Sequence, residues 1–409
     1  MHVDFSLSSE EQLFRDSVRS FLAEKVQPIW TRIDEEALIP TSLIREMGEQ
    51  GLFAIAVPEE YGGQGGGFLL TALAAEEIGY HDPSMALAVF TLLNNAWPYI
   101  LYLYGQEEAR EEILPRVGRG EAFFGIASTE PRGGSDVGGL QTRAVKVDGG
   151  YRVEGEKIYI SGVREVMDQL DWGGWLLLAR TGRPEDRHRG ITALALLGKR
   201  QGAKTGGIEY SILDTIGRHG ISTGILRLNG VEVGEAYRVG EENRGFYVAM
   251  EGFNLARILV AAANIGSARW ALERMVEYSR ERELFGKPIA SFQGVSFPIA
   301  ELAMELEAAR LLVYRAAWLA DRIYKDKEPG LRPRDLGKYS AMAKLKAVQV
   351  NKAMYDQLMQ VYGALSYTKE AQVFRGMLAS LSYYVGAEGA QNIMRYIIAS
   401  SIIGREYTK

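Results

Sequence analysis

The order of hydrophobic patterns along the chain limits its fold more than any other feature. Up to about residue 120, apolar residues recur at helical spacing, after a Ser8-Ser9-Glu10-Glu11 start that resembles a capping box. Residues 123–239 contain short β-like runs separated by Gly and Asp turns. Long amphipathic patterns return from Gly245. The expected order is helices, a sheet, then helices, in three domains at 1–122, 123–239 and 240–409.

Composition limits the possible partners and chemistry. The 409 residues are 47% hydrophobic and 24% charged, with a formal net charge of -5, so a basic nucleic-acid face is not expected. There is no cysteine, and the four histidines form no pair at ligand spacing, so no metal site is expected. The start at Met1–Asp4 has no targeting pattern, and no apolar run approaches a membrane span. We therefore expect a cytoplasmic protein without a membrane partner.

Two segments of the central region carry the most chemistry. A β-like run enters Ile126–Asp136, where Pro131 and two glycines break regular structure beside Thr and Ser hydroxyls. This composition suits close approach to a polar ligand, and equally suits a plain hairpin turn. Downstream, Gly155–Ser161 places an aromatic residue and a hydroxyl on a β-like segment.

Together these segments resemble the flavin-binding middle domain of the acyl-CoA dehydrogenases, with its TEP-x-x-GSD and G-x-K-x-[WFY]-I-[ST] motifs. The resemblance extends along the chain through Val57–Gly63, Ile216–Arg218, Asn243–Phe246 and Arg280–Ile289. It implies an α+β fold with an N-terminal helical domain, a central antiparallel β-barrel or sandwich-like domain, and a C-terminal four-helix bundle. It also implies FAD as cofactor and an acyl-CoA thioester as substrate.

The resemblance assigns cofactor contacts to the sheet domain. Tyr159 would stack beside the flavin ring and Ser161 would bond near its N5 edge, where the family more often has Trp and Thr. A core aromatic on a strand is the alternative for Tyr159. Ser135 would serve the cofactor pyrophosphate or the CoA chain. The remaining residues expected at the ring edge are Ile126, Ser128 and Thr129.

A second set of cofactor contacts would come from a neighbouring subunit. Arg282 and Phe285 are three apart, which predicts one helical face. The resemblance puts this Arg on the FAD phosphates, a task that suits its planar guanidinium. The same half-site would include Gln293, Gln360 and Ala364 (where the family has glycine), and Asn392 is a further expected cofactor contact. A shared cofactor implies an obligate oligomer, a homotetramer or a dimer.

The base that removes the substrate α-proton is expected at Glu388. It lies seven residues before Arg395, as the family pattern requires, although Ala387 and Ala390 replace the usual Tyr and Thr. A rival register would put Val385 there and leave no base. Some family members place the base in an earlier helix, one residue before an Arg. In this chain that position is Ala256, before Arg257, and alanine cannot act as a base. A surface Glu in a Gly-flanked loop is the alternative for Glu388.

Asn254 and Arg257 would line the CoA channel, although Arg257 can equally be a helix-surface charge. The expected reaction is α,β-dehydrogenation in fatty acid metabolism, with the proton passing to Glu388 and the hydride to flavin N5. An electron-transferring flavoprotein is the expected acceptor. The alternatives are an acyl-CoA oxidase or flavin monooxygenase that uses O₂, and a non-catalytic flavin- or CoA-binding protein.

Overall fold

The computed structural model describes residues 6–408, so the expectation drawn from Met1–Asp4 lies outside the described residues. Within residues 6–121, six α-helices form the N-terminal part. The first begins with the predicted capping box, in which the Glu11 N–H donates to Ser8 Oγ at 3.2 Å. The helices are α1 (Ser9–Lys25), α2 (Trp30–Glu35), α3 (Thr41–Glu49), α4 (Phe68–His81), α5 (Ala86–Tyr104) and α6 (Glu107–Gly118).

A mostly antiparallel sheet follows, with strand order β6-β5-β4-β2-β3-β8-β7. β1 and β2 both pair with β4 in parallel, and β9 pairs with β5. The β-like runs predicted in this region correspond to β1, β2, β3, β4, β5 and β8, and β6, β7 and β9 are additional strands. The strands are β1 (Ala122–Ala127), β2 (Arg143–Val147), β3 (Gly150–Ser161), β4 (Trp172–Arg180), β5 (Ile191–Arg200), β6 (Ala203–Lys204), β7 (Ile208–Ile212), β8 (Thr223–Gly234) and β9 (Arg238–Val239).

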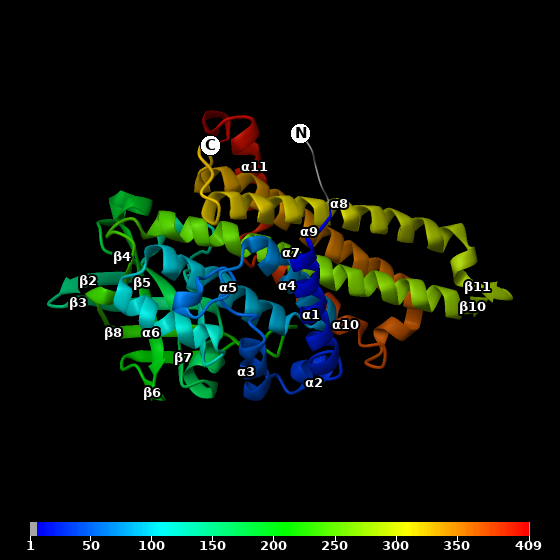
Figure 1. The fold of residues 1–409 in the computed structure, drawn as a ribbon, viewed down its shortest axis with the longest axis horizontal. Helices are drawn as coiled ribbons and strands as arrows, with labels where there is room; N and C mark the ends of the chain where they lie inside the picture. Colours follow the sequence, from blue (N-terminus) through cyan, green and yellow to red (C-terminus); the bar gives the residue numbers. More distant parts are fainter. Residues whose placement is uncertain (1–5, 409) are drawn as a thin grey trace.

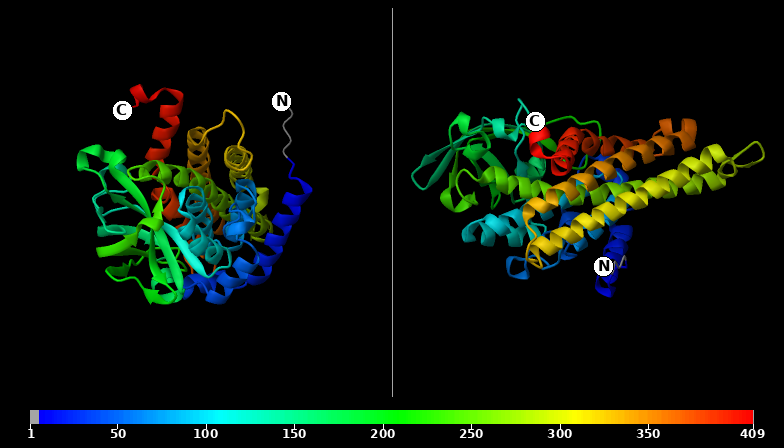
Figure 2. Two further views of the ribbon diagram at one scale, coloured as in Figure 1. Left: turned by 60° about the vertical axis from the view of Figure 1, so that its left-hand side comes forward. Right: turned by 90° about the horizontal axis from the view of Figure 1, so that it is seen from above.

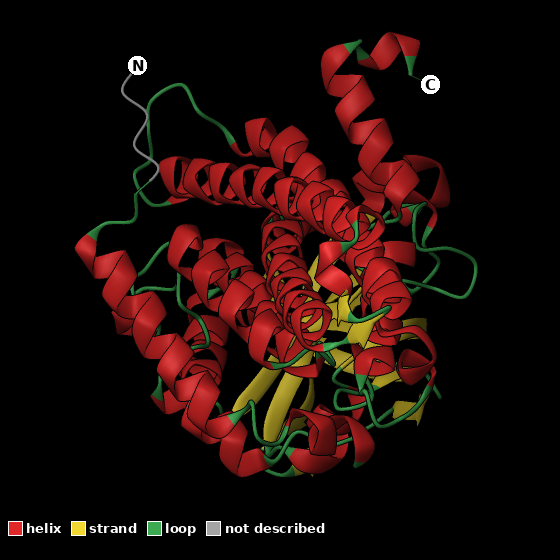
Figure 3. Cartoon of the chain, turned by 90° about the vertical axis from the view of Figure 1, so that its right-hand side faces the viewer, coloured by secondary structure: helices red, strands yellow, loops and turns green. Residues whose placement is uncertain are grey.

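The C-terminal part is a bundle of long helices with one hairpin at its far end, which confirms the predicted order of helices, sheet and helices (Figure 1). In Figure 3, which views the molecule from the hairpin end, the helices lie in front of the strands. The elements are α7 (Gly245–Glu281), β10 (Glu283–Leu284), β11 (Lys287–Pro288), α8 (Gln293–Tyr324), α9 (Pro333–Tyr362), α10 (Val373–Val385) and α11 (Gln391–Ile402).

α7 is the central helix of the molecule. Its 37 residues span about 55 Å at 1.5 Å per residue, from the sheet to the hairpin. It packs on α4, α5, α8 and α9. Contact with α4 is very close, since a Cβ on Gly266 would lie 1.9 Å from the Glu76 carbonyl oxygen. The two views in Figure 2 show this helix running beneath the other bundle helices and against the sheet.

Among the residues that the structure describes, two helices, α5 and α7, are long and apolar enough to cross a membrane by length and composition alone. The expectation concerned uninterrupted apolar runs, and α5 is interrupted by Asn94 and Asn95. In α5, 89% of the most apolar stretch is buried inside the protein, and in α7 the share is 67%. Such burial is what core helices of a folded domain show, because their apolar side chains pack against neighbouring elements.

Candidate active site

A buried ion pair joins the two sheet segments singled out from the sequence. Lys157 of β3 is 0% exposed, and its Nζ lies 2.8 Å from Glu130 Oε1 and 3.2 Å from the Ser128 carbonyl oxygen. Glu130 also accepts from the backbone N–H groups of Gln141 and Thr142. The Ile158 N–H donates to the Thr129 carbonyl oxygen at 2.9 Å. The segment after β1 is thereby tied to β3.

The charges of this pair are tuned by burial and by each other. Burial alone would raise the pKa of Glu130, but Lys157 and the two hydrogen-bond donors bring that pKa below its usual value. Burial lowers the pKa of Lys157 to about 8, against the raising effect of Glu130. Neither residue was a candidate from the sequence. The sequence did contain a signal for this ion pair, since Glu130 belongs to the first motif and Lys157 to the second.

Tyr159 is directed outward by a β-bulge. The pairing of β3 with β8 shifts between Ile158 and Ile160, and Tyr159 at the shift has φ +60°. Its side chain is 66% exposed, so the alternative of a core aromatic is wrong. Bulges of this kind redirect a side chain next to functional sites. An exposed aromatic face beside the Ser128–Thr129 segment fits a flat aromatic group such as a flavin ring.

The other predicted ring-edge residues occupy the same part of the sheet. Ile126 lies in β1, and Ser128 and Thr129 follow its end; all three are half-buried. Ser161 ends β3, where its carbonyl oxygen accepts from Trp175 Nε1 at 3.0 Å. Ser135 is exposed in the loop after the TEP motif. Its neighbour Asp136 pairs with Arg187, with 2.6 Å between Oδ1 and Nη2.

Glu388 lies in the turn between α10 and α11 and is half-buried. Its φ of +57° is strained for a residue with a side chain, and Gly389 follows with φ +117°. Arg257 Nε of α7 donates to the Glu388 carbonyl oxygen at 3.0 Å. Within residues 6–408, the Glu388 N–H donates to no acceptor. Val385, the rival position, lies in the last turn of α10 with an exposed side chain.

Arg257 is 5% exposed and is therefore not a helix-surface charge. Besides the Glu388 carbonyl oxygen, its guanidinium binds Asn254 Oδ1 at 2.9 Å. Burial lowers the pKa of Arg257 to about 10, an effect that Glu388 opposes. Asn254 also accepts from Ser340 Oγ at 3.3 Å. The two residues thus form one polar group beneath the Glu388 turn.

The electrostatic surroundings of Glu388 act in two directions. Burial raises the pKa of Glu388, while the nearby cations Arg257, Lys344 and Arg218 lower it in part. The net result is a carboxyl group with a raised pKa, which is the condition of a base that works near neutral pH.

The Arg282–Phe285 pair is not on a helix, contrary to the prediction. α7 ends at Glu281, and the next residues form the β10–β11 hairpin at the far end of the bundle (Figure 1). Its two-residue loop, Phe285-Gly286, has positive φ at both positions, as a type I′ turn requires. Phe285 is 92% exposed. The three-residue spacing was misleading here, because Phe285-Gly286 forms a hairpin turn and the helix has already ended at Glu281.

The remaining predicted residues are distributed over the bundle. Gln293 begins α8, Gln360 lies in the last turn of α9, and Ala364 follows it, all with exposed side chains. Gln360 also lines a groove of about 800 Å³ between α8 and α9. Asn392 is exposed in the first turn of α11, where its Oδ1 accepts from Arg395 at 2.9 Å. None of these four residues belongs to the turn between α10 and α11 that contains Glu388.

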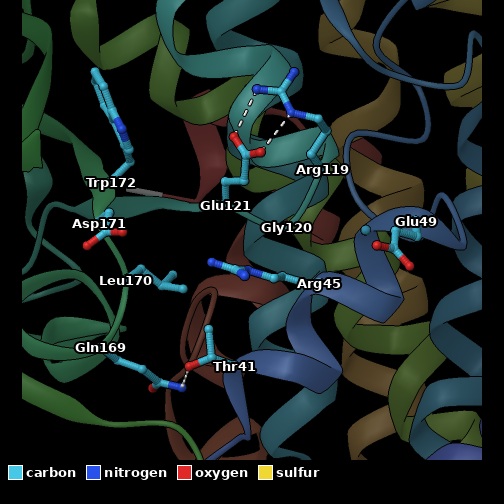
Figure 4. A pocket seen from close by; sticks show the side chains of 11 residues that line it. Thr41, Arg45, Glu49, Arg119, Gly120, Glu121, Gln169, Leu170, Asp171 and Trp172 are labelled. Atoms are coloured by element: carbon cyan, nitrogen blue, oxygen red, sulfur yellow. Dashed lines mark hydrogen bonds and ion pairs between the residues drawn. The ribbon is translucent and has the colours of Figure 1, made fainter. Parts of the chain in front are cut away.

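A separate cavity of about 500 Å³ lies between α3, the α6–β1 connection and the start of β4 (Figure 4). Arg45 extends into it, and Arg119 and Glu121 form a two-bond ion pair on its wall. None of the predicted site residues lines this cavity. Among the residues that the structure describes, no group of three His, Cys, Asp or Glu side chains is placed to hold a metal ion.

Comparison with known proteins identifies the family. The N-terminal, middle and C-terminal acyl-CoA dehydrogenase domain models match residues 8–121, 125–231 and 243–403. The chain is 33% identical over 403 residues to the probable acyl-CoA dehydrogenase YngJ of Bacillus subtilis, covering 98% of this chain and 100% of that one. The chain therefore belongs to the acyl-CoA dehydrogenase family, and it is an oxidoreductase.

Solved structures have the same fold. The glutaryl-coenzyme A dehydrogenase in complex with glutaryl-CoA superimposes with a TM-score of 0.88 at 31% identity, covering 100% of this chain and 98% of that chain. Butyryl-CoA dehydrogenase from Megasphaera elsdenii has a TM-score of 0.86 at 30% identity, covering 98% and 100%.

Replacing Lys157 with Met should lower the free energy of unfolding by about 3–5 kcal/mol, because Glu130 would remain buried without its counter-charge. Urea denaturation measures the loss. Adding Glu130→Gln to Lys157→Met should recover part of it. The control is Lys146→Met, which removes an exposed ion pair with Glu242 and should change stability by less than about 1 kcal/mol. Equal free energies of unfolding for the Lys157 and Lys146 variants would contradict a stabilising role of the buried Lys157–Glu130 pair.

Proposed function

We propose that this protein oxidises the Cα–Cβ bond of an acyl-CoA thioester to give the 2-enoyl-CoA, with Glu388 as the base. The observation that carries the proposal is the Glu388 turn, in which the buried Arg257 donates to the Glu388 carbonyl oxygen and burial raises the pKa of the Glu388 carboxyl group. Burial of this carboxyl group makes it a better proton acceptor near neutral pH than a solvent-exposed glutamate.

FAD is the cofactor. The residues that would hold its ring are those near the carboxyl ends of β1 and β3: Ile126, Ser128, Thr129, Tyr159 and Ser161. The outward Tyr159 side chain and the Ser128–Thr129 segment, anchored by the buried Lys157–Glu130 pair, provide a rigid aromatic and polar edge. When bound, FAD supplies the acceptor for the hydride that leaves the substrate β-carbon.

Glu388 would act through two of its groups. A carboxylate oxygen accepts the proton from the substrate α-carbon. The backbone N–H, which has no acceptor among the described residues, donates to the thioester carbonyl oxygen, where negative charge develops. The bond from Arg257 fixes the adjoining carbonyl, so both groups are oriented before substrate arrives. Ser135 and Asn254 are the proposed contacts of the CoA chain.

The proposed electron acceptor is an electron-transferring flavoprotein. Support comes from the CarC subunit of the caffeyl-CoA reductase-Etf complex of Acetobacterium woodii, which is 30% identical over 397 residues. Acryloyl-CoA reductase (NADH) of Anaerotignum propionicum is 32% identical over 405 residues, so relatives of this chain also include reductases. Rapid reoxidation of the reduced flavin by air alone would favour an oxidase instead.

Replacing Glu388 with Gln should retain FAD and lower turnover with acyl-CoA by at least about 10²-fold, because the amide cannot accept the α-proton. The rate at which acyl-CoA bleaches the flavin absorbance under anaerobic conditions measures flavin reduction, which requires removal of the α-proton. Glu370→Gln is the matched control, since Glu370 is exposed on the loop before α10. Turnover close to wild type in Glu388→Gln would remove Glu388 from this role.

The FAD site is proposed to be shared between subunits of a homotetramer. Arg282 and Phe285 belong to the segment of the β10–β11 hairpin, which lies at the opposite end of the molecule from β3, the strand that contains Tyr159 (Figure 1). An almost fully exposed Phe beside an exposed Arg suits contact with the adenosine and phosphates of a neighbour's cofactor. Gln293 and Gln360 lie at the same end of the bundle, at the start of α8 and the end of α9.

Replacing Arg282 with Ala should weaken FAD binding about tenfold or more, because a charge-assisted hydrogen bond contributes about 1.5–3 kcal/mol. Titration of the apoprotein with FAD gives the affinity, and the unfolding midpoint should not change. Arg280→Ala is the control, since Arg280 is an exposed arginine two residues earlier, in the last turn of α7. Identical FAD affinities in the two variants would contradict a shared site.

An apolar stripe along α8 provides the surface for a second copy. Its members are spaced seven residues apart, which puts them on one helical face, and each is about half exposed or more. They are Phe297, Met304, Leu311 and Trp318. Met304 also lines the α8–α9 groove that contains Gln360, so the stripe continues into the proposed shared half-site. Exposed apolar surface of this kind marks an association interface.

Replacing Leu311 with Glu should shift the protein to smaller assemblies and reduce its FAD content, because a charge would be buried without a partner in the stripe. Sedimentation velocity and the flavin absorbance measure both effects. Leu13→Glu is the matched control, since Leu13 is an exposed leucine on α1. If the Leu311 variant assembles like the Leu13 variant, α8 does not form the interface.

A further inference from the structure

Lys344 is a fully buried lysine for which the proposed reaction has no assigned use. It lies in the middle of α9 and is 0% exposed, a rare position for a lysine. Its Nζ donates to the Tyr383 carbonyl oxygen and to the Gly389 carbonyl oxygen, both at 2.8 Å. Tyr383 lies in the last turn of α10, and Gly389 directly follows Glu388. The ammonium group therefore bridges the two sides of the Glu388 turn.

Two buried cations from different helices thus hold two consecutive carbonyl groups. Arg257 of α7 binds the carbonyl oxygen of Glu388, and Lys344 of α9 binds that of Gly389. The Gly389 N–H donates to the Gly386 carbonyl oxygen at 2.9 Å. The positive φ of Glu388 is unfavourable for a residue with a Cβ, so the turn keeps this shape only if several contacts fix it.

We propose that Lys344 is a positioning residue for proton transfer: it fixes the turn that presents the Glu388 carboxylate and N–H to the substrate, and it places a buried positive charge beside that turn. This inference rests on the function proposed above. It assigns to Lys344 no contact with substrate or cofactor. Its action is transmitted through the backbone of residues 383–389 and through the electric field at Glu388.

The charges around Glu388 come from three directions. Arg257 on α7, Lys344 on α9 and Arg218 in the loop before β8 all lower its pKa, whereas burial raises it. Tyr383 on α10 also interacts electrostatically with Glu388: burial and Glu388 raise the pKa of its phenol, and Arg218 lowers it in part. Burial lowers the pKa of Lys344 to about 8, with Glu388 raising it and Arg257 lowering it further.

The sign of the expected effect follows from these contributions. A base must be ionised to accept a proton, so turnover rises with pH through the pKa of Glu388. Removing the Lys344 charge removes one contribution that lowers this pKa. The acid limb of the pH profile should then move to higher pH. A lysine that only anchored α9 to α10 would affect stability and leave the acid limb in place.

The test compares Lys344→Met, Lys344→Arg and Lys352→Met as FAD-loaded full-length proteins. Lys352 lies on the same helix, where it pairs with Asp356 at the surface. We expect Lys344→Met to retain FAD, to lose at least about tenfold in kcat, and to show an acid limb about 1 pH unit higher. Lys344→Arg should keep the wild-type acid limb, because the charge is retained. Lys352→Met should match wild type in both quantities.

An unchanged acid limb in Lys344→Met would overturn the inference, whatever the change in kcat. If that variant does not retain FAD, Lys344→Gln takes its place: it keeps an NH₂ donor group, has no charge, and must show the same shift of the acid limb. Glu388→Gln in the same series separates the two proposals. An inactive Glu388→Gln with a normal Lys344→Met overturns only the role of Lys344, whereas an active Glu388→Gln overturns the proposed reaction.

Discussion

The hydrogen bond from Arg257 to the Glu388 carbonyl oxygen connects the longest helix of the protein to its proposed base. α7 packs on α4, α5 and the other bundle helices, so the position of Arg257 is set by the core of the whole molecule. The same helix ends at the hairpin that carries Arg282. A single rigid element thereby determines the position of the base in one subunit and, in the proposed assembly, of the cofactor contact offered to another.

Buried cations stabilise both halves of the proposed site. In the sheet domain Lys157 binds Glu130 and the Ser128 carbonyl oxygen, and in the bundle Lys344 binds two carbonyl groups around Glu388. Removing a cation from water has a large free-energy cost, which is offset only when its partners are held in good geometry. Because other conformations would leave the buried cation without its partners, each segment has one well-defined conformation. Rigid placement of reacting groups is what a proton transfer from a weak carbon acid requires.

The sequence was sufficient for the order of elements and the family, because hydrophobic periodicity and motif spacing are local properties. The role of Glu388 stays a prediction. The Arg282–Phe285 error arose because three-residue spacing also occurs in a hairpin with a Phe-Gly turn. The bulge at Tyr159 was not predictable, since no glycine marks it. Lys344 gave no signal of its role, because its partners are backbone carbonyl groups, which leave no pattern in a sequence.

The most direct measurement is an experimental structure of the protein with FAD and a bound acyl-CoA ester. The account predicts the α-carbon within reach of a Glu388 carboxylate oxygen and the thioester oxygen on the Glu388 N–H. It also predicts the flavin ring beside Tyr159, with Arg282 of another subunit on the same cofactor. A thioester whose α-carbon faces a different side chain, with the Glu388 carboxylate turned to solvent, would contradict it.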